Sequence, residues 1–319
     1  MSAGPKELSV VRSSPDRVEE ALTALLAAGP AASARFARQA ESSRVSLDRI
    51  WCLADEFGRY RLAVLAVPTL GRTSMLLASH ARSADEANLL GRAVSAAAEG
   101  CADACDIAQA LVEPSRPLDV ASFEAGGLVR LATLDYLERN LPRAGSLEAP
   151  AAPTGWTIEP VADPAVLGGA DPAALGKDRR AELIAVLESS YRDTRDCPGL
   201  AGMRRTTDVL DGHFGLGARP RHWLVARESG VARGVCLVNA APDAQSAELV
   251  YLGLSPEARG KGLAKALLAA SLHACSLARI GIVSLAVDTL NEPAKRLYLA
   301  HGFRRASSRV ALVRRLHGA

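Results

Sequence analysis

The residues with the clearest chemical meaning lie in the run LGLSPEARGKGLAKALL, residues 252–268. This run predicts an apolar strand, a sharp turn and a glycine-containing loop that opens a helix. Backbone N–H groups of such a loop and the positive end of the helix dipole can bind a phosphate, because small side chains allow close approach. The loop residues are Arg259, Gly260, Lys261, Gly262, Leu263 and Ala264. Taken alone, the loop is equally compatible with a tight turn that binds nothing.

A second chemically suggestive stretch is IVSLAVDTLNEPAKRLYLAHGF, residues 282–303, which predicts a strand and then a helix that begins at Asn291. Tyr298 follows Asn291 by seven residues, so both side chains project from nearly the same helix face. A phenol with a pKa of about 10 can act as a proton donor. The alternatives are a tyrosine packed for its ring and an asparagine that only caps the helix.

Together these motifs resemble the GNAT superfamily of acyl-CoA-dependent N-acetyltransferases. The shared features are Arg-x-x-Gly-x-Ala after a strand ending Leu-x-Pro, and a later strand followed by Asn-x-Pro-Ala-x-x-x-Tyr-x-x-x-Gly-Phe. The resemblance implies that the 259–264 loop binds the pyrophosphate of acetyl-CoA and that Tyr298 protonates the departing thiolate. It also implies cofactor contacts from Asn291 and Lys295, and no metal.

The strand AELVYLGL carries the candidate general base, Glu248. Regular alternation along this strand would place Glu248, Val250, Leu252 and Leu254 on one side. In the histone-acetylating branch of the family, a glutamate in a closely similar run is the base. A surface glutamate paired with an arginine, with deprotonation through water, is the alternative.

Backbone N–H groups of Leu252, Gly253 and Leu254 are expected to polarise the thioester carbonyl. Donors that are freed where two neighbouring strands separate need no reorganisation during reaction. Pantetheine would bind along the same strand edge as an extra pseudo-strand.

The acceptor site is the least defined part of the sequence. In GNAT folds the first two helices and their connection cover the substrate cleft, which here corresponds to residues 189–214. Candidate contacts are Tyr191, Asp193, Asp196 and Arg204. Acids mixed with arginines would fit an amine that also carries an anionic group, whereas solvated loop charges are the simpler alternative.

The first half of the chain repeats the second. With Ile107 set against Ile282, the register continues without a gap until Gly127 meets Gly302. A repeat of this length predicts two copies of one fold. The resulting fold class is α/β (α+β), with two GNAT-like domains that each have a mixed, mostly antiparallel sheet flanked by helices.

The first copy has lost the residues that carry the chemistry. Phe123 stands where Tyr298 is, Arg116 stands where Asn291 is, and residues 80–91 place no glycine where the phosphate loop should be. We therefore expect the N-terminal copy to be degenerate, with a structural role such as completing the cleft or forming a dimer face.

Length and composition fit a two-domain globular protein. The 319 residues are 49% hydrophobic and 23% charged, with a net charge of only +3. Residues 141–155 are rich in Pro, Ala and Gly, so we expect a domain at 1–140, a linker at 141–155 and a catalytic domain at 156–319. The small net charge argues against nucleic acid as the main partner.

Cysteine usage and hydropathy predict a cytoplasmic protein. No apolar run approaches the roughly 20 residues of a membrane span, and no signal peptide is evident. A reduced compartment suits the unpaired cysteine spacing, and Cys101 and Cys105 are expected to be structural. The six cysteines are Cys52, Cys101, Cys105, Cys197, Cys236 and Cys275.

The leading hypothesis is an N-acetyltransferase that moves the acetyl group of acetyl-CoA to a primary amine of a small molecule or peptide, by direct attack in a ternary complex. The tandem layout also resembles that of the mycothiol synthases, which acetylate a cysteinyl amino-sugar conjugate. The alternative from another class is a non-catalytic acyl-CoA-binding or scaffolding protein. A homodimer is an option in each case.

Overall fold

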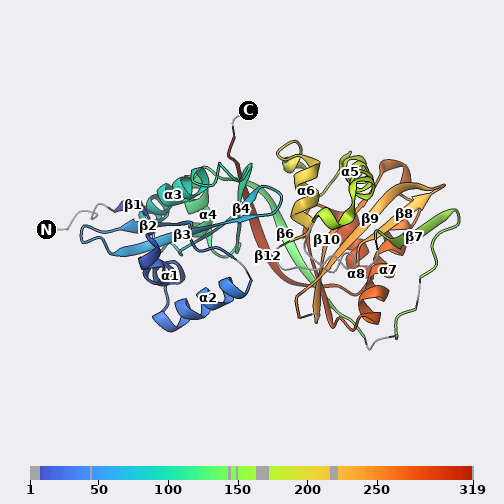
Figure 1. Ribbon diagram of the computed structural model, residues 1–319, viewed down its shortest axis with the longest axis horizontal. Coiled ribbons are helices and arrows are strands. Elements are labelled where there is room, and N and C mark those ends of the chain that lie inside the picture. Colours follow the sequence, from blue (N-terminus) through green and yellow to red (C-terminus); the bar gives the residue numbers. More distant parts are fainter. Residues whose placement is uncertain are drawn as a thin grey trace. The chain divides into compact units, whose positions relative to one another are not determined.

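A computed structural model describes most of the chain and groups its contacts into two compact units (Figure 1). The N-terminal unit contains Met1–Ala132 with Arg309–Ala319, and the C-terminal unit contains Thr133–Ser308. Three residues of the expected linker, 143, 144 and 149, lie outside the described residues. The described ranges are 8–43, 45–142, 145–148, 150–162, 172–215, 222–243 and 245–317.

Both repeats run through the same order of elements: strand, two helices, three strands, helix, strand, helix, strand. The first repeat consists of β1 (Ser9–Arg12), α1 (Val18–Leu26), α2 (Pro30–Ser42), β2 (Ile50–Ala54), β3 (Tyr60–Thr69), β4 (Thr73–Ala78), α3 (Ala84–Glu99), β5 (Ile107–Val112), α4 (Pro117–Ala125) and β6 (Val129–Asn140). The second consists of β7 (Trp156–Pro160), α5 (Lys177–Tyr191), α6 (Thr206–His213), β8 (Leu224–Glu228), β9 (Val231–Ala240), β10 (Ser246–Leu254), α7 (Leu263–Leu277), β11 (Ile282–Asp288), α8 (Glu292–Ala300) and β12 (Arg304–Arg315). This confirms the mixed fold class.

Each unit has a six-stranded sheet with one parallel pair. The strand order is β1-β2-β3-β4-β5-β12 in the N-terminal unit and β6-β11-β10-β9-β8-β7 in the C-terminal unit. The parallel pairs are β4 with β5 and β10 with β11. The last strand of each sheet comes from the other repeat, because β6 pairs with β11 and β12 pairs with β5.

Helices cover both faces of the C-terminal sheet, and each layer has its own apolar core (Figure 1). Under α5 and α6, the fully buried rings of Phe214 and Trp223 lie with centroids 4.8 Å apart. Under α7 and α8, Leu267, Leu285 and Phe303 are buried in a second core. Burying a side chain of this size stabilises the fold by roughly 1.5–3 kcal/mol. These two cores fix the strands between which the site lies.

The N-terminal sheet is layered in the same way, with α1 and α2 on one face and α3 and α4 on the other (Figure 1). Leu22 and Leu65 are buried on the first face, and Leu90 and Phe123 on the second. Within the described part of the chain, no helix has both the length and the hydropathy of a membrane span. All six cysteines are free thiols.

Candidate active site

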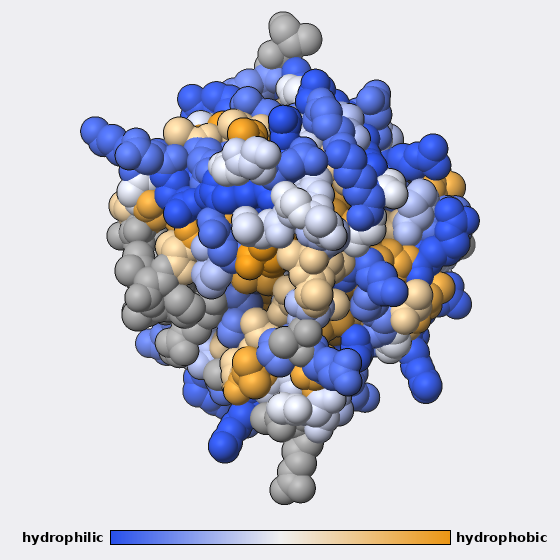
Figure 2. Space-filling view, turned by 90° about the vertical axis from the view of Figure 1, so that its right-hand side faces the viewer, coloured by the Kyte–Doolittle hydropathy of each residue, from blue (hydrophilic) through white to orange (hydrophobic). Residues whose placement is uncertain are grey.

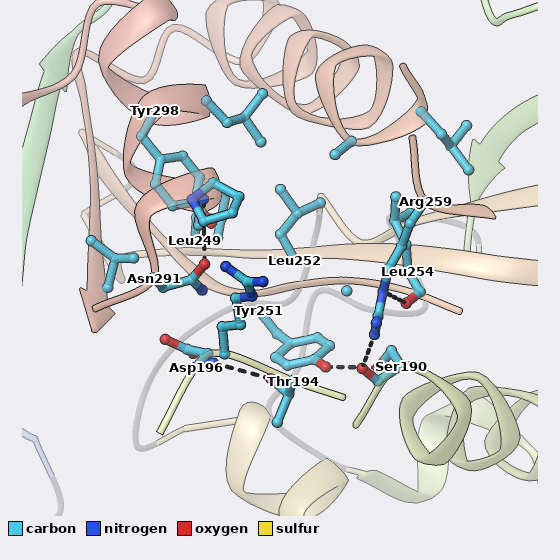
Figure 3. Close-up of a pocket in the computed structure, with 18 of the residues that line it drawn as sticks. Ser190, Thr194, Asp196, Leu249, Tyr251, Leu252, Leu254, Arg259, Asn291 and Tyr298 are labelled. Atoms are coloured by element: carbon cyan, nitrogen blue, oxygen red, sulfur yellow. Dashed lines mark hydrogen bonds between the residues drawn. The ribbon is translucent and has the colours of Figure 1, made fainter. Parts of the chain in front are cut away.

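A cavity of about 490 Å³ opens in the C-terminal unit, at the ends of β10 and β11 (Figure 3). Its wall also contains the loop before α7, one side of α8 with the preceding Asn291, and the segment that follows α5. Seen from the side of this unit, the surface carries hydrophobic side chains in its middle and hydrophilic ones around them (Figure 2).

The cavity exists because β10 and β11 separate. Their parallel pairing ends at Leu249 and Leu285, although β10 continues to Leu254 and β11 to Asp288. Beyond this point, the backbone groups of β10 and β11 that face each other have no strand partner among the described residues, and residues from both strands line the cavity. The separation expected from the sequence is therefore present.

Two of the three expected carbonyl donors face this open edge. The Ser255 N–H donates to Arg233 O of the neighbouring β9 side, at 2.8 Å. Because N–H directions alternate along a strand, the N–H of Gly253 also faces β9, while those of Leu252 and Leu254 face the gap. The open edge thus presents two main-chain donors spaced along one strand.

A β-bulge in β10 changes which side chains share a face. The register between β10 and β9 shifts at Val250, so Val250 and Tyr251 both pack on the α5/α6 side. Leu252 and Leu254 pack on the α7/α8 side instead. The expectation that Glu248, Val250, Leu252 and Leu254 lie on one side is therefore wrong, because the extra residue reverses the alternation.

The loop before α7 has the backbone geometry of an anion site. Gly260 and Gly262 have φ values of +76° and +77°, which favour glycine, and a Cβ at either position would meet nothing within 4 Å. Gly262 is the N-cap of α7 and provides no side-chain cap. The first-turn N–H groups of Leu263, Ala264 and Lys265 therefore have no intrahelical partner.

Arg259, unlike the glycines of the loop, makes structural hydrogen bonds with its side chain. Its guanidinium donates to the main-chain carbonyls of Leu254, Ser190 and Arg192, at 3.3, 3.0 and 2.7 Å (Figure 3). Its N–H donates to Pro256 O within the turn. Arg259 thus ties the loop to the end of α5, and the free N–H groups of the loop begin after it.

The three lysines near the site differ in whether their side chains line the cavity. Lys261 pairs with Glu228 at 3.4 Å and Lys295 with Glu292 at 3.1 Å, and neither lines the cavity. Lys265, which the sequence analysis did not select, is exposed and lines it. Its signal in the sequence is its position three residues after Gly262, in the first turn of the helix.

Tyr298 and Asn291 come from α8 and both line the cavity (Figure 3). Tyr298 is buried, with its ring 5.8 Å from that of Phe303, and burial raises its pKa above the ordinary value. Among the described residues, its hydroxyl has no hydrogen-bond partner. Asn291 caps α8, since its Oδ1 accepts the Ala294 N–H at 3.4 Å, and it can also reach a ligand in the cavity.

The four candidate acceptor contacts separate into two pairs. Asp193 and Asp196 line the cavity, whereas Tyr191 and Arg204 do not. Tyr191 packs edge-on against Tyr251 at 5.8 Å, and burial raises its pKa. Its buried hydroxyl has no hydrogen-bond partner in the described part of the chain.

Glu248 lies at the edge of this arrangement. It sits opposite Ser284, where β10 and β11 are still paired, and it is not among the cavity-lining residues. The side chain is exposed, but neighbouring protein atoms remove part of its hydration, which raises its pKa. Its role as the base stays a prediction. No cluster of three or more His, Cys, Asp or Glu side chains suited to a metal occurs within the described ranges.

Comparison with known proteins agrees with this geometry. Residues 187–303 match the acetyltransferase (GNAT) family. A GCN5-related N-acetyltransferase from Sphaerobacter thermophilus superposes with a TM-score of 0.59 at 17% identity, covering 99% of this chain and 98% of that one. A tandem GNAT protein from the clavulanic acid biosynthesis pathway gives 0.56 at 17% identity, covering 98% and 100%. No curated protein matches the sequence.

These matches confirm the resemblance inferred from the motifs. The structural similarity extends over both repeats and shows the fold, while the family match covers the residues that surround the cavity. Residues 187–303 of the C-terminal unit therefore match a GNAT acetyltransferase domain, and this match supports an acyl-transfer activity. The neighbouring tandem protein has the same two-repeat layout.

Proposed function

We propose that the protein is an N-acetyltransferase that moves the acetyl group of acetyl-CoA to a primary amine, by direct attack in a ternary complex. The observation that carries the proposal is the single cavity in which the uncapped start of α7, the open edge of β10 and Tyr298 meet. Each of the three serves a different part of an acyl-CoA: its phosphates, its thioester carbonyl and its sulfur.

The residues present fit acetyl-CoA. The unpartnered N–H groups at the start of α7 suit a pyrophosphate, and the space above Gly260 and Gly262 lets it approach the backbone. Lys265 adds a positive charge at the same end of the cavity. The open edge of β10 suits the amides of pantetheine. When bound, acetyl-CoA supplies an activated acetyl group.

The chain's own residues then act on the developing charges. The N–H groups of Leu252 and Leu254 are fixed in the strand, so they can stabilise negative charge on the carbonyl oxygen without reorganisation. Tyr298, whose raised pKa keeps its proton at any working pH, donates a hydrogen bond to the leaving sulfur. Asn291 and Lys295 stay predicted cofactor contacts.

The rival proposal, a non-catalytic acyl-CoA-binding protein, would need none of the catalytic groups. The cavity nevertheless contains a buried tyrosine whose hydroxyl has no partner among the described residues, at the place where a leaving sulfur would lie. This favours catalysis. The N-terminal repeat is proposed to be structural, while a cytoplasmic location and a homodimer stay predictions.

Titration calorimetry and a CoA-release assay test the proposal. We expect one acetyl-CoA per chain, because only the second repeat has glycines and an uncapped helix at the phosphate position. Release of CoA should depend on an added amine, from a panel of amines, polyamines, aminoglycosides and peptides. Binding without release by any member would favour the scaffolding alternative, and two equivalent sites per chain would contradict the assignment to one repeat.

A further inference from the structure

The segment after α5 is docked on the end of β11 by two reciprocal hydrogen bonds. The Asp288 N–H donates to Oδ1 of Asp196 at 3.2 Å, and the Cys197 N–H donates to Oδ2 of Asp288 at 3.2 Å. Asp193 and Cys197 have φ values of 55° and 44°, in the left-handed region that non-glycine residues rarely adopt. Such conformations persist where surrounding contacts enforce them, and they cluster at functional sites.

This docking places Asp196 in the wall of the cavity that Tyr298 also lines. Both residues line the cavity, and Figure 3 shows Asp196 on the wall opposite α7, close to Tyr251. Burial raises the pKa of Tyr298 and of Tyr251 most, and the negative charge of Asp196 adds to both shifts. The carboxylate therefore lies within electrostatic reach of the groups between which an acceptor and the acetyl group would meet.

The surroundings of Asp196 favour proton uptake. The groups around it are Asp288 of β11, Asn291 and Tyr298 of α8, Tyr251 of β10, and its chain neighbours Cys197 and Arg195, the second of which also lines the cavity. Partial desolvation by the cavity wall raises its pKa most, and the charge of Asp288 adds to this. Hydrogen bonds from the Asp288 N–H and Asn291 lower it, without reversing the shift. The side chain is still exposed at the cavity mouth, so an incoming amine can reach it.

The other candidate base is less well placed. Glu248 lies outside the cavity, on the paired part of β10, and Leu252 and Leu254 are separated from it by the bulge. A general base must come within hydrogen-bond reach of the proton that it removes, or within one water of it. Of Glu248 and Asp196, only Asp196 lines the cavity that also contains the open edge of β10 and Tyr298.

We propose that Asp196 accepts the proton from the acceptor's ammonium group, which rests on the proposed acetyl transfer. One N–H bond of the ammonium breaks, its proton moves to a carboxylate oxygen of Asp196, and the electron pair stays on nitrogen. The nitrogen then forms a bond to the acetyl carbon and loses a second proton, while the C–S bond breaks with its electron pair on sulfur. The sulfur gains one proton, and Asp196 returns the other to water.

The test compares Asp196→Asn with Glu248→Gln over a range of pH. D196N keeps an oxygen for the Asp288 N–H, so we expect unchanged acetyl-CoA affinity. Its kcat/KM should fall by roughly 10²-fold near neutral pH, and the loss should shrink as pH approaches the pKa of the acceptor amine. Asp178→Asn, which removes an exposed charge from α5, is the control for charge alone. Wild-type activity and pH profile in D196N, or the pH-dependent loss in E248Q instead, would overturn the proposal.

Thermal unfolding gives a second readout that needs no acceptor. A carboxyl whose pKa is raised by folding destabilises the folded state above that pKa, and the effect vanishes below its unfolded pKa of about 3.9. D196N should therefore raise Tm at neutral pH, relative to D178N, and the gain should disappear in acid. A lower Tm at neutral pH would show that the carboxylate is structural and would overturn the proposal. Lack of CoA release by the wild type, in contrast, counts against acetyl transfer itself, while the Tm comparison still shows whether the Asp196 carboxylate is structural.

Discussion

The first turns of α3 and α7 occupy the same place in the two repeats, but they differ in how their N–H groups are capped and in the charge of their side chains. At α3, Ser83 Oγ accepts the Glu86 N–H at 3.1 Å, and Glu86 Oε2 accepts the Arg82 N–H at 2.8 Å. Asp85 and Glu86 also place negative charge in that turn. At α7 a glycine N-cap leaves the N–H groups open and no acid is present in the first turn. The N–H groups at the start of α3 are capped by side chains of the same turn, whereas no side chain caps the start of α7.

The next helix of each repeat extends this contrast. In α4, Asp119 accepts the Ala81 N–H at 3.0 Å and bonds to His80 Nδ1 at 2.7 Å, so it binds the segment that precedes α3. The corresponding residue of α8 is Ala294, which lines the cavity. A small side chain in the second repeat leaves space where the first repeat places a buried carboxylate.

The corresponding strands β4 and β10 also differ, because only β10 has an irregular pairing with its neighbour. β4 pairs with β3 without a register shift, whereas β10 is longer and contains the bulge at Val250. Both repeats keep the parallel pair and both cores. The comparison shows that the two repeats share one fold although they differ at these positions, because the differences are a few local departures from regular structure that leave the cores in place.

The largest expected effect comes from giving the second repeat an acid like those of the first. Gly262→Asp places a negative charge at the start of α7, and it should remove two or more charge-assisted hydrogen bonds to phosphate, each worth about 1.5–3 kcal/mol. Acetyl-CoA affinity should fall on the order of 10³-fold by calorimetry. Gly262→Asn is the matched control, since it has nearly the same shape, tolerates a positive φ and carries no charge. Equal affinities for the two variants would show that charge at this turn is irrelevant.

The tyrosine position of α8 offers the next comparison, with its own control in the chain. Tyr298→Phe makes the second repeat like the first at Phe123, and it removes the hydrogen bond to the leaving sulfur. We expect kcat to fall by roughly 10²-fold while acetyl-CoA affinity changes little. Phe123→Tyr should leave CoA release unchanged. Full activity in Y298F would mean that the sulfur leaves unassisted.

Much of this arrangement follows from the sequence because it is local. The glycine spacing gives the turn before α7, and the order of elements in both repeats follows from apolar periodicity and the repeat itself. The bulge at Val250 has no local signal, since it depends on how β10 pairs with β9. The docking of Asp196 joins residues that are 92 positions apart along the chain, so no spacing rule reveals it. Lys265 was not predicted because phosphate binding was assigned to loop residues 259–264 and not to the first turn of the helix that follows them.

The smallest expected effect tests the closed helix start in the first repeat. Ser83→Ala removes the N-cap acceptor of the Glu86 N–H and should lower the free energy of unfolding by about 0.5–2 kcal/mol, with Ser83→Gly costing only a few tenths. Chemical denaturation measures both. Neither variant should change the stoichiometry of acetyl-CoA, because the acids Asp85 and Glu86 remain and Asp119 still binds the preceding segment. A second acetyl-CoA bound by Ser83→Ala would show that the cap alone closes this site, and the contrast between the repeats would then reduce to one hydroxyl group.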